Sequence, residues 1–238
     1  MSVFIVGNIG YDIPVIYGVT EGSPAQEGGL RAGDRIISMN GKRIRVHRQI
    51  SNYVTFHQGE TVRFVYERDG KRKETTISPV LMGGSYKFGI SGAAFRARTN
   101  VADTLKYSAY EVYYWIDVTL QSLKMLVSGG VSIDDMSGPV GVVDMIGETY
   151  EESRSSGLFY IWLNMMNIAI LLTANLGVMN LLPIPALDGG RLVFLILEAV
   201  RGKKTNPEVE AKIHFAGLVL LMFLMVVIMF NDVKKLFL

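Results

Sequence analysis

The chain has 238 residues, of which 49% are hydrophobic and 19% are charged, and its formal net charge at pH 7 is +2. So small an excess of positive charge does not give the basic surface of a nucleic-acid-binding domain, so we expect no nucleic acid, neither DNA nor RNA, as a partner. The sequence has no cysteine, which excludes disulfides and thiolate metal ligands. Two long stretches in its second half are nearly uncharged, which indicates a soluble part followed by a membrane part.

The chain begins with a short apolar stretch, MSVFIVGNI, that ends at Ile9. A spanning helix needs roughly 20 residues, so this stretch is too short to cross a membrane. It also lacks the basic region and the small-residue cleavage site of a signal peptide. We interpret residues 1–12 as the remnant of a preceding membrane span.

Residues 13–92 have the pattern of a small soluble α+β domain. Asn40-Gly41 and Asp69-Gly70 are strong hairpin-turn signals. Ser23-Pro24 predicts the start of a short helix by cap and proline chemistry, and residues 46–56 predict a second, amphipathic helix. Runs of β-branched residues predict strands at 15–20, 35–39, 61–68 and 73–80.

The stretch Gly22-Ser23-Pro24-Ala25, followed by Gly29-Leu30-Arg31-Ala32-Gly33-Asp34, resembles a circularly permuted bacterial PDZ domain. The resemblance covers nearly all of residues 13–92. It implies that an extended peptide adds as a strand to an open sheet edge, with backbone amides receiving a carboxylate. Phe88, Gly89 and Ile90 are the candidates for that loop and edge. The alternatives are an ordinary closing strand there, or a domain that only excludes bulky proteins.

Residues 93–157 form an amphipathic linker region. Tyrosines, a tryptophan and charged residues alternate between Asn100 and Gly129, which predicts a helix with Thr99 or Asn100 as its N-cap. The charges exclude the centre of a bilayer, whereas Tyr and Trp favour the headgroup region. We therefore predict a helix at the membrane interface, with packing against the preceding domain as the alternative. From its residues alone, Ser137-Gly138-Pro139-Val140-Gly141 predicts only a turn.

Residues 158–200 are long and apolar enough for a spanning helix with a broken continuation. Pro183 and Pro185 lack backbone donors and obstruct the preceding turn, so they break the helix. Broken backbone at membrane depth persists only when it is buried in protein or lines a wet cavity. We therefore expect Asp188 to face the protein interior, and an ionisable residue in such a place is a functional candidate.

The stretch Asn180-Leu-Leu-Pro183-Ile-Pro185-Ala-Leu-Asp188-Gly189-Gly190 resembles a signature of the site-2 protease family, the intramembrane zinc metalloproteases. The resemblance implies a catalytic Zn²⁺ with Asp188 as one ligand and two histidines of a His-Glu-x-x-His helix as the others. It places Asn180 and Pro185 near the substrate, a transmembrane protein such as a membrane-anchored regulator. From the residues alone, a kinked helix with Asp188 as N-cap is the alternative.

The three histidines, His47, His57 and His214, do not have the His-Glu-x-x-His spacing. We interpret the first two as surface or partly buried residues of the soluble domain and the third as an interfacial residue. The expectation is therefore a C-terminal part of a longer enzyme, inactive as an isolated chain, with the missing helix before residue 1. Residues 137–141 resemble a Gly-Pro-Val-Gly element that family members carry before their third helix.

Residues 201–238 contain a basic connection, 201–212, and a final uninterrupted span, 213–230. By the positive-inside rule the connection is cytoplasmic, which puts the soluble domain and the C-terminus outside the cytoplasm. The expected location is the inner or plasma membrane, with the chain crossing the lipid bilayer more than once.

The predicted fold class is mixed: a permuted α+β PDZ-like domain, then an amphipathic helical region, then α-helical transmembrane segments. The leading function is a membrane-embedded zinc metalloendopeptidase, and the alternative is a non-catalytic, membrane-anchored PDZ module that binds peptide. A transporter half also has broken helices with an acid at mid-membrane, but the soluble domain and only two spans argue against it.

Overall fold

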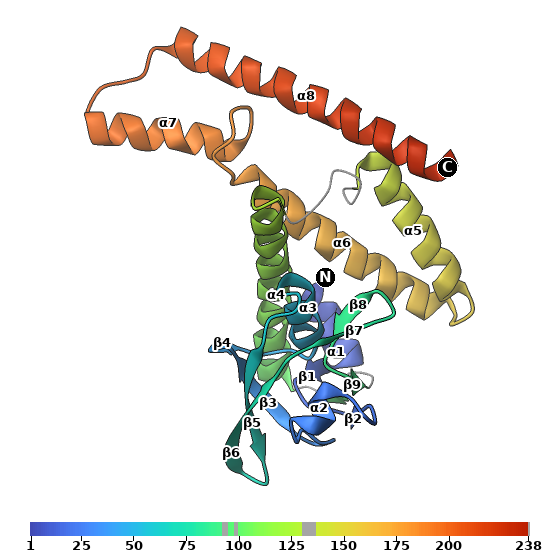
Figure 1. Ribbon diagram of the computed structural model, residues 1–238. Helices are drawn as coiled ribbons and strands as arrows, with labels where there is room; N and C mark the ends of the chain where they lie inside the picture. The colour runs from blue at the N-terminus through green and yellow to red at the C-terminus, as the bar shows by residue number, and fades with distance from the viewer. Residues whose placement is uncertain (92–94, 98–99, 130–136, 238) are drawn as a thin grey trace. The chain divides into compact units, whose positions relative to one another are not determined.

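The computed structural model describes residues 1–91, 95–97, 100–129 and 137–237. The chain divides into two compact units, Met1–Val118 and Thr119–Leu238. Figure 1 shows the elements of both units along the chain.

The first unit contains short helices and short antiparallel strands. Its helices are α1 (Ser2–Ile9), α2 (Pro24–Glu27), α3 (Arg48–Phe56) and the first part of α4 (Val101–Val127). Its strands are β1 (Tyr11–Ile13), β2 (Gly18–Val19), β3 (Arg35–Met39), β4 (Lys42–Arg43), β5 (Val62–Arg68), β6 (Lys71–Ile77), β7 (Val80–Met82), β8 (Ser85–Lys87), β9 (Ile90–Ser91) and β10 (Phe95–Ala97). We call residues 11–91 the β-domain.

The largest sheet has four antiparallel strands in the order β4-β3-β5-β6, and the other strands pair as β1-β10, β2-β9 and β7-β8. Both predicted hairpin turns are present. Asn40 and Gly41 have φ of 46° and 82°, and Asp69 and Gly70 have φ of 53° and 71°. Two consecutive residues with positive φ match the twist of the flanking strands, which is why these dipeptides close hairpins.

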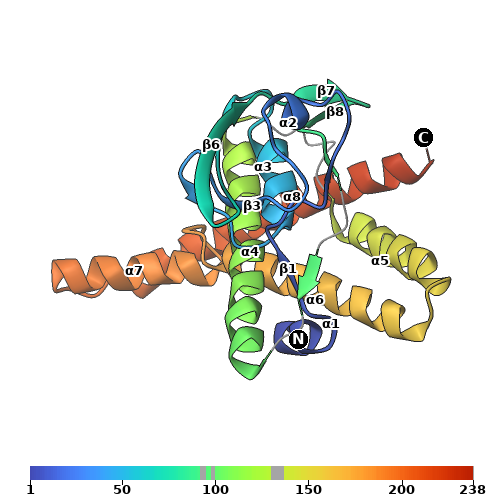
Figure 2. The ribbon, with the colours of Figure 1, turned by 90° about the horizontal axis from the view of Figure 1, so that it is seen from below.

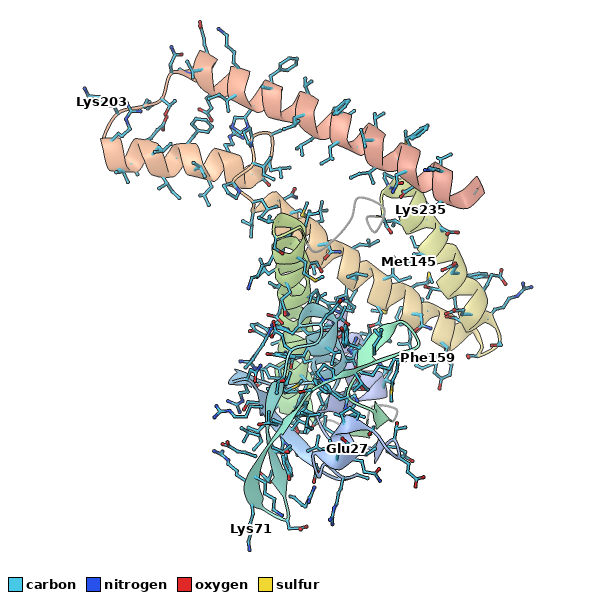
Figure 3. The ribbon with its side chains drawn as sticks, in the orientation of Figure 1. Glu27, Lys71, Met145, Phe159, Lys203 and Lys235 are labelled. Atoms are coloured by element: carbon cyan, nitrogen blue, oxygen red, sulfur yellow. The ribbon has the colours of Figure 1, made fainter. Side chains whose placement is uncertain are left out.

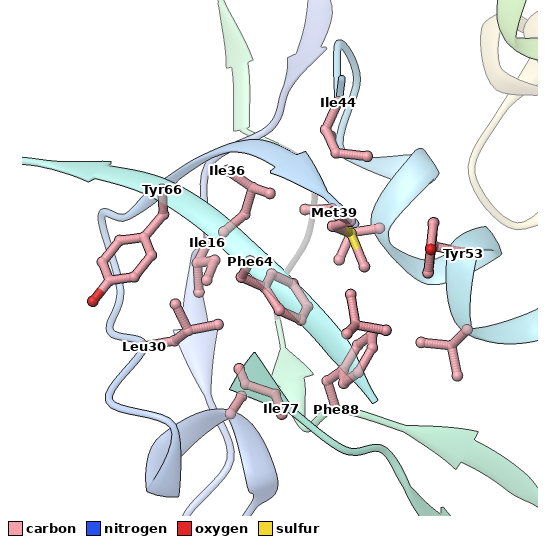
Figure 4. Packing of buried hydrophobic residues seen from close by; sticks show 14 residues of the cluster. Ile16, Leu30, Ile36, Met39, Ile44, Tyr53, Phe64, Tyr66, Ile77 and Phe88 are labelled. Atoms are coloured by element: carbon pink, nitrogen blue, oxygen red, sulfur yellow. The ribbon is translucent and has the colours of Figure 1, made fainter. Parts of the chain in front are cut away.

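The core of the β-domain lies between the four-stranded sheet and helices α2 and α3 (Figure 4). Phe64 is fully buried at its centre, and its ring meets the ring of Phe88 edge-on with centroids 5.0 Å apart. The other fully or nearly fully buried members include Ile16, Leu30, Ile36, Met39 and Val62. This core places the loop that carries Phe88 against the sheet.

Several predicted boundaries were wrong by a few residues. The predicted strand 73–80 is β6 up to Ile77 and β7 from Val80, because Pro79 between them cannot donate to a ladder. The predicted strand 15–20 is reduced to β2, with Val15 in a single bridge to Arg35. The helix predicted over 46–56 begins at Arg48.

Helix α4 forms as predicted, and the side chain of Asn100 caps it by accepting from the backbone N–H of Asp103 at 2.8 Å. Up to Val118 it packs against the β-domain, which is the alternative to the interface prediction. Two charged contacts join them: Lys42 Nζ to Asp117 at 2.7 Å and Arg48 Nη2 to Glu111 at 2.5 Å. Contact with a membrane interface stays a prediction.

The described helices of the second unit are the end of α4, then α5 (Pro139–Arg154), α6 (Leu158–Asn180), α7 (Asp188–Arg201) and α8 (Pro207–Phe237). Figure 2 shows α5 and α6 side by side after a tight turn. Among the described helices, two are long and apolar enough to cross a membrane, over Leu158–Asn180 and Pro207–Lys235. The helical break expected within 158–200 is present, since α6 ends at Asn180 and α7 begins at Asp188.

Helix α5 corrects the prediction of a mere turn at residues 137–141. Gly138 is its N-cap and Pro139 its first residue, a position that proline favours because the missing N–H would have no partner there. The N–H groups of Gly138 and Gly141 donate to the carboxylate of Asp232 on α8, each at 2.9 Å. Asp232 is only 3% exposed. The cap of α5 therefore comes from a residue more than 90 positions away, which local sequence could not reveal.

Candidate functional site

The break between α6 and α7 folds back onto the start of α7. A β-carbon on Gly189 would lie 2.2 Å from the carbonyl oxygen of Leu182, and one on Gly190 would lie 2.3 Å from that of Ile184. Both positions therefore need glycine, because backbone atoms cannot give way as a flexible side chain can. The two glycines of the signature thus let the break pack closely against the first turn of α7.

Ala186, in the middle of the break, has a φ of +79°. The other described non-glycine residues with positive φ are Asn40 and Asp69, residue types that tolerate this conformation in turns. For alanine it is strained and persists only when its surroundings impose it.

Two contacts with helix α8 hold Ala186 in its conformation of positive φ. The N–H of Ala186 donates to Nδ1 of His214 at 2.9 Å. One turn further along α8, a β-carbon on Gly217 would lie 2.5 Å from the carbonyl oxygen of Pro185. Residues three apart on a helix face the same side, so His214 and Gly217 together form the surface on which the break rests.

A cavity of about 420 Å³ lies where the break, α7 and α8 meet. Asp188 lines it in the first turn of α7, and Arg191, Glu210 and His214 are the other charged or titratable residues of its wall. The carboxylate of Glu210 lies 3.9 Å from Nε2 of His214. The cavity thus gathers two carboxylates, an imidazole and a guanidinium around the end of a helical break.

The alternative interpretation of Asp188 as an N-cap was wrong. The N-cap is Leu187, whose backbone is extended, and no side chain caps this helix end. Asp188 already has helical backbone, so its carboxylate is not used on the amides of the next turn. Asp188 is exposed on the cavity wall.

The structure brings together some of the predicted site residues. Pro185 lies in the break, Asp188 follows it as the first residue of α7, and Asn180 is the last residue of α6, where the break begins. His214 was missed, because its partner Ala186 lies 28 positions away and its helix reads as an ordinary apolar span.

The described residues contain no group of three His, Cys, Asp or Glu side chains that could hold a metal ion. Asp188, in a cavity and free of any capping bond, fits the role of one ligand. A three-ligand catalytic zinc site is therefore not completed by the described part of this chain.

The loop at Phe88–Ile90 is the second candidate site. Gly89 has a φ of +80°, and a β-carbon there would lie 2.1 Å from Cβ of Ser23, so no other residue fits. The carbonyls of Phe88 and Gly89 accept from the N–H groups of Ala25 and Thr20 at 2.9 and 2.8 Å. Within the described ranges, the N–H groups of Phe88 and Gly89 have no acceptor, and β9 has β2 as its single neighbour.

The pKa values of His47 in the β-domain and Tyr114 on α4 are shifted by burial in the packed protein. Burial lowers the pKa of His47, which favours its neutral form. Burial also raises the pKa of Tyr114, whose hydroxyl accepts from Nδ2 of Asn52 at 2.7 Å. The ring of His57 stacks on Tyr53 with centroids 4.1 Å apart. His57 is thus partly buried, as predicted, whereas His47 is buried, so the prediction of a surface or partly buried position was wrong for His47.

Comparisons with known proteins agree with the signature. A zinc metalloprotease RasP of Geobacillus kaustophilus is 38% identical over all of this chain and 56% of its own length. A regulator of sigma-W protease RasP of Bacillus subtilis is 37% identical over 94% of this chain and 52% of its own length. The chain therefore spans about half the length of these curated relatives.

The PDZ domain of an SdrC-like protein from Listeria monocytogenes covers 35% of this chain and 90% of its own, with 24% identity and a TM-score of 0.30. The sequence profile of Peptidase family M50 matches residues 4–224. Since that match covers most of the chain, the chain belongs to Peptidase family M50, the site-2 proteases.

Proposed function

We propose that this chain forms the Asp188-bearing part of an intramembrane zinc metalloendopeptidase. The observation that carries the proposal is the position of Asp188: it opens α7 directly after a double-proline break, on the wall of a cavity, without a capping role. A bound zinc would polarise a scissile carbonyl and lower the pKa of its water. Asp188 is the residue of this chain that would hold it.

The remaining ligands come, in this proposal, from a His-Glu-x-x-His helix outside the 238 residues. Two findings support it: the described residues hold no three-ligand group, and the curated relatives are nearly twice as long. The isolated chain would then be inactive. The shortage of zinc ligands among the described residues also supports a second candidate, a non-catalytic membrane-anchored module that binds peptide.

The unwound backbone of the break is suited to present a substrate segment. Pro183 and Pro185 keep the break from becoming helix, and an extended segment of substrate can then pair with exposed backbone groups. We assign Asn180 and Pro185 to this role. The substrate class is a transmembrane protein such as a membrane-anchored regulator, in keeping with the name of the relative from Bacillus subtilis.

We further propose that residues 13–92 are a permuted PDZ domain whose peptide site is Phe88, Gly89 and Ile90. Unpaired amides at a loop that only glycine can form are suited to receive a carboxylate, and a single-neighbour strand is suited to accept another strand. In this arrangement residues 1–12 end a preceding span and residues 93–157 connect the domain to the membrane part. Residues 158–200 form a broken transmembrane helix, and residues 201–238 form a cytoplasmic loop followed by the final transmembrane helix.

The test is Asp188→Asn in the complete enzyme, with cleavage of a membrane-embedded reporter and protein abundance measured together. The amide keeps the shape but is neutral and a far poorer ligand. Loss of a residue that merely orients a metal ligand already costs about 10–100-fold, so cleavage should fall by roughly 100-fold or more at unchanged abundance.

Asp144→Asn, at an exposed acid on α5, is the matched control and should cleave normally. Full cleavage in Asp188→Asn would rule out the ligand role. Cleavage that falls only in step with abundance would show that Asp188 serves folding.

A further inference from the structure

We propose that His214 is a positioning residue that holds the helical break in its strained form, so that Asp188 lies on the cavity wall. The inference deepens the proposed function and rests on it for its catalytic meaning. Its structural part stands on contacts within the second unit: the hydrogen bond to Ala186, the φ of Ala186 and the close approach of Gly217.

The strain at Ala186 requires an external partner. The neighbouring amides of the break bond locally, since the N–H of Ile184 donates to Leu182 and that of Leu187 to Ile184. The N–H of Ala186 instead crosses to α8. Because an alanine left to itself would avoid a φ of +79°, this long-range bond selects the conformation that Ala186 adopts.

The hydrogen bond from Ala186 also defines which ring nitrogen of His214 carries the proton. Nδ1 accepts from a backbone N–H, so it carries no proton, and the ring proton is on Nε2. Nε2 is buried without a hydrogen-bond partner among the described residues, 3.9 Å from Glu210. The ring of Phe194 on α7 lies 5.6 Å away. His214 is therefore a neutral acceptor held between α7 and its own helix.

The conformation of Ala186 affects the position of Asp188 because the two residues are close in the chain. Ala186 lies two residues before Asp188, so a rotation of its peptide reorients the first turn of α7 directly. Gly217 lets α8 approach Pro185 closely enough for the hydrogen bond to form. The pair on α8 thus determines both the distance and the orientation of the break.

The experiment measures amide hydrogen exchange of the full chain in detergent micelles, in the peptide that covers residues 181–190. His214→Leu removes the acceptor at similar size. His214→Asn keeps one, because its Oδ1 replaces Nδ1. Phe215→Leu, at a side chain 67% exposed on the same helix, is the control.

In His214→Leu the amide of Ala186 should exchange at least about tenfold faster, the change expected for one buried hydrogen bond. His214→Asn and Phe215→Leu should exchange as the parent does. Unchanged exchange in His214→Leu, or equal acceleration in His214→Asn, would overturn the proposal.

A second variant distinguishes local opening of the break from unfolding of the rest of the unit. The amides at residues 140–142 lie in the first turn of α5, where the N–H of Gly141 donates to Asp232 of α8, and they report on unfolding in another part of the second unit. If they also exchange faster in His214→Leu, Ala186→Gly is added, because glycine adopts positive φ without strain. Restored protection at residues 140–142 supports the proposal, and continued loss contradicts it.

Cleavage assays separate this inference from the proposed function. In the complete enzyme His214→Leu should cut at least about tenfold more slowly, with His214→Asn close to the parent. If His214→Leu alters amide exchange and Asp188→Asn keeps full activity, the zinc role is refuted and the positioning contact stands. If His214→Leu leaves amide exchange unaltered and Asp188→Asn is inactive, only the positioning contact is refuted.

Discussion

Asp34 and Arg68 form the most deeply buried ion pair among the described residues of the β-domain. Two guanidinium nitrogens of Arg68 donate to the two carboxylate oxygens of Asp34 at 2.7 Å, and the N–H of Arg31 donates to Asp34 at 2.8 Å. Arg68 also donates to the carbonyl of Gly29. The hydrogen bond to Asp34 raises the pKa of Arg68. The pair thus ties the loop before β3 to the end of β5.

Asp34→Ala should therefore destabilise the β-domain by about 3 kcal/mol, because it leaves an arginine partly buried without its counter-charge. Urea unfolding of the full chain, followed by Trp115 fluorescence in a Trp162→Phe background, measures the change. Glu74→Ala is the matched control, since Glu74 is 60% exposed and lies 3.9 Å from Arg63, and it should change stability by less than about 0.5 kcal/mol. Equal effects of both variants would contradict the argument.

At the scale of elements, the local sequence pattern correctly predicted hairpin turns and a helix cap in the β-domain. The turns at Asn40-Gly41 and Asp69-Gly70 and the cap at Ser23, which accepts from the N–H of Gln26, were correct because their geometry depends on adjacent residues. Helix α5 was missed because its cap, Asp232, is distant in sequence. The packing of α4 on the β-domain was only an alternative, since its charges find partners on α3 and β4.

The capping of α5 by Asp232 leads to a prediction for this element. Asp232→Ala leaves the N–H groups of Gly138 and Gly141 without an acceptor and removes a negative charge from a helix N-terminus. Loss of such a cap costs about 1–2 kcal/mol. Amide exchange at residues 140–142 should accelerate accordingly, while exchange in α3 of the first unit stays the same. Protection that persists at residues 140–142 would show that the cap contributes nothing.

At the scale of the whole molecule, the proposed topology places the β-domain outside the cytoplasm and residues 201–212 inside. Figure 3 labels a suitable probe position in each: Lys71 at the tip of the β5–β6 hairpin and Lys203 between α7 and α8. The chain has no cysteine, so single-cysteine variants label cleanly. In intact protoplasts Lys71→Cys should react with an impermeant maleimide, and Lys203→Cys should react only after lysis. The reverse pattern would invert the topology.

By itself the sequence determined the family, the apolar spans, the helical break at Pro183 and Pro185, and Asp188 as the residue to examine. Each of these depends on residue type and local spacing, which act within a turn or a hairpin. Only the tertiary structure decided that Leu187 and not Asp188 is the N-cap of α7, and that His214 and Gly217 of α8 hold the break. These contacts join segments about 30 residues apart, and an apolar span carries no local signal of which of its faces will meet a strained backbone.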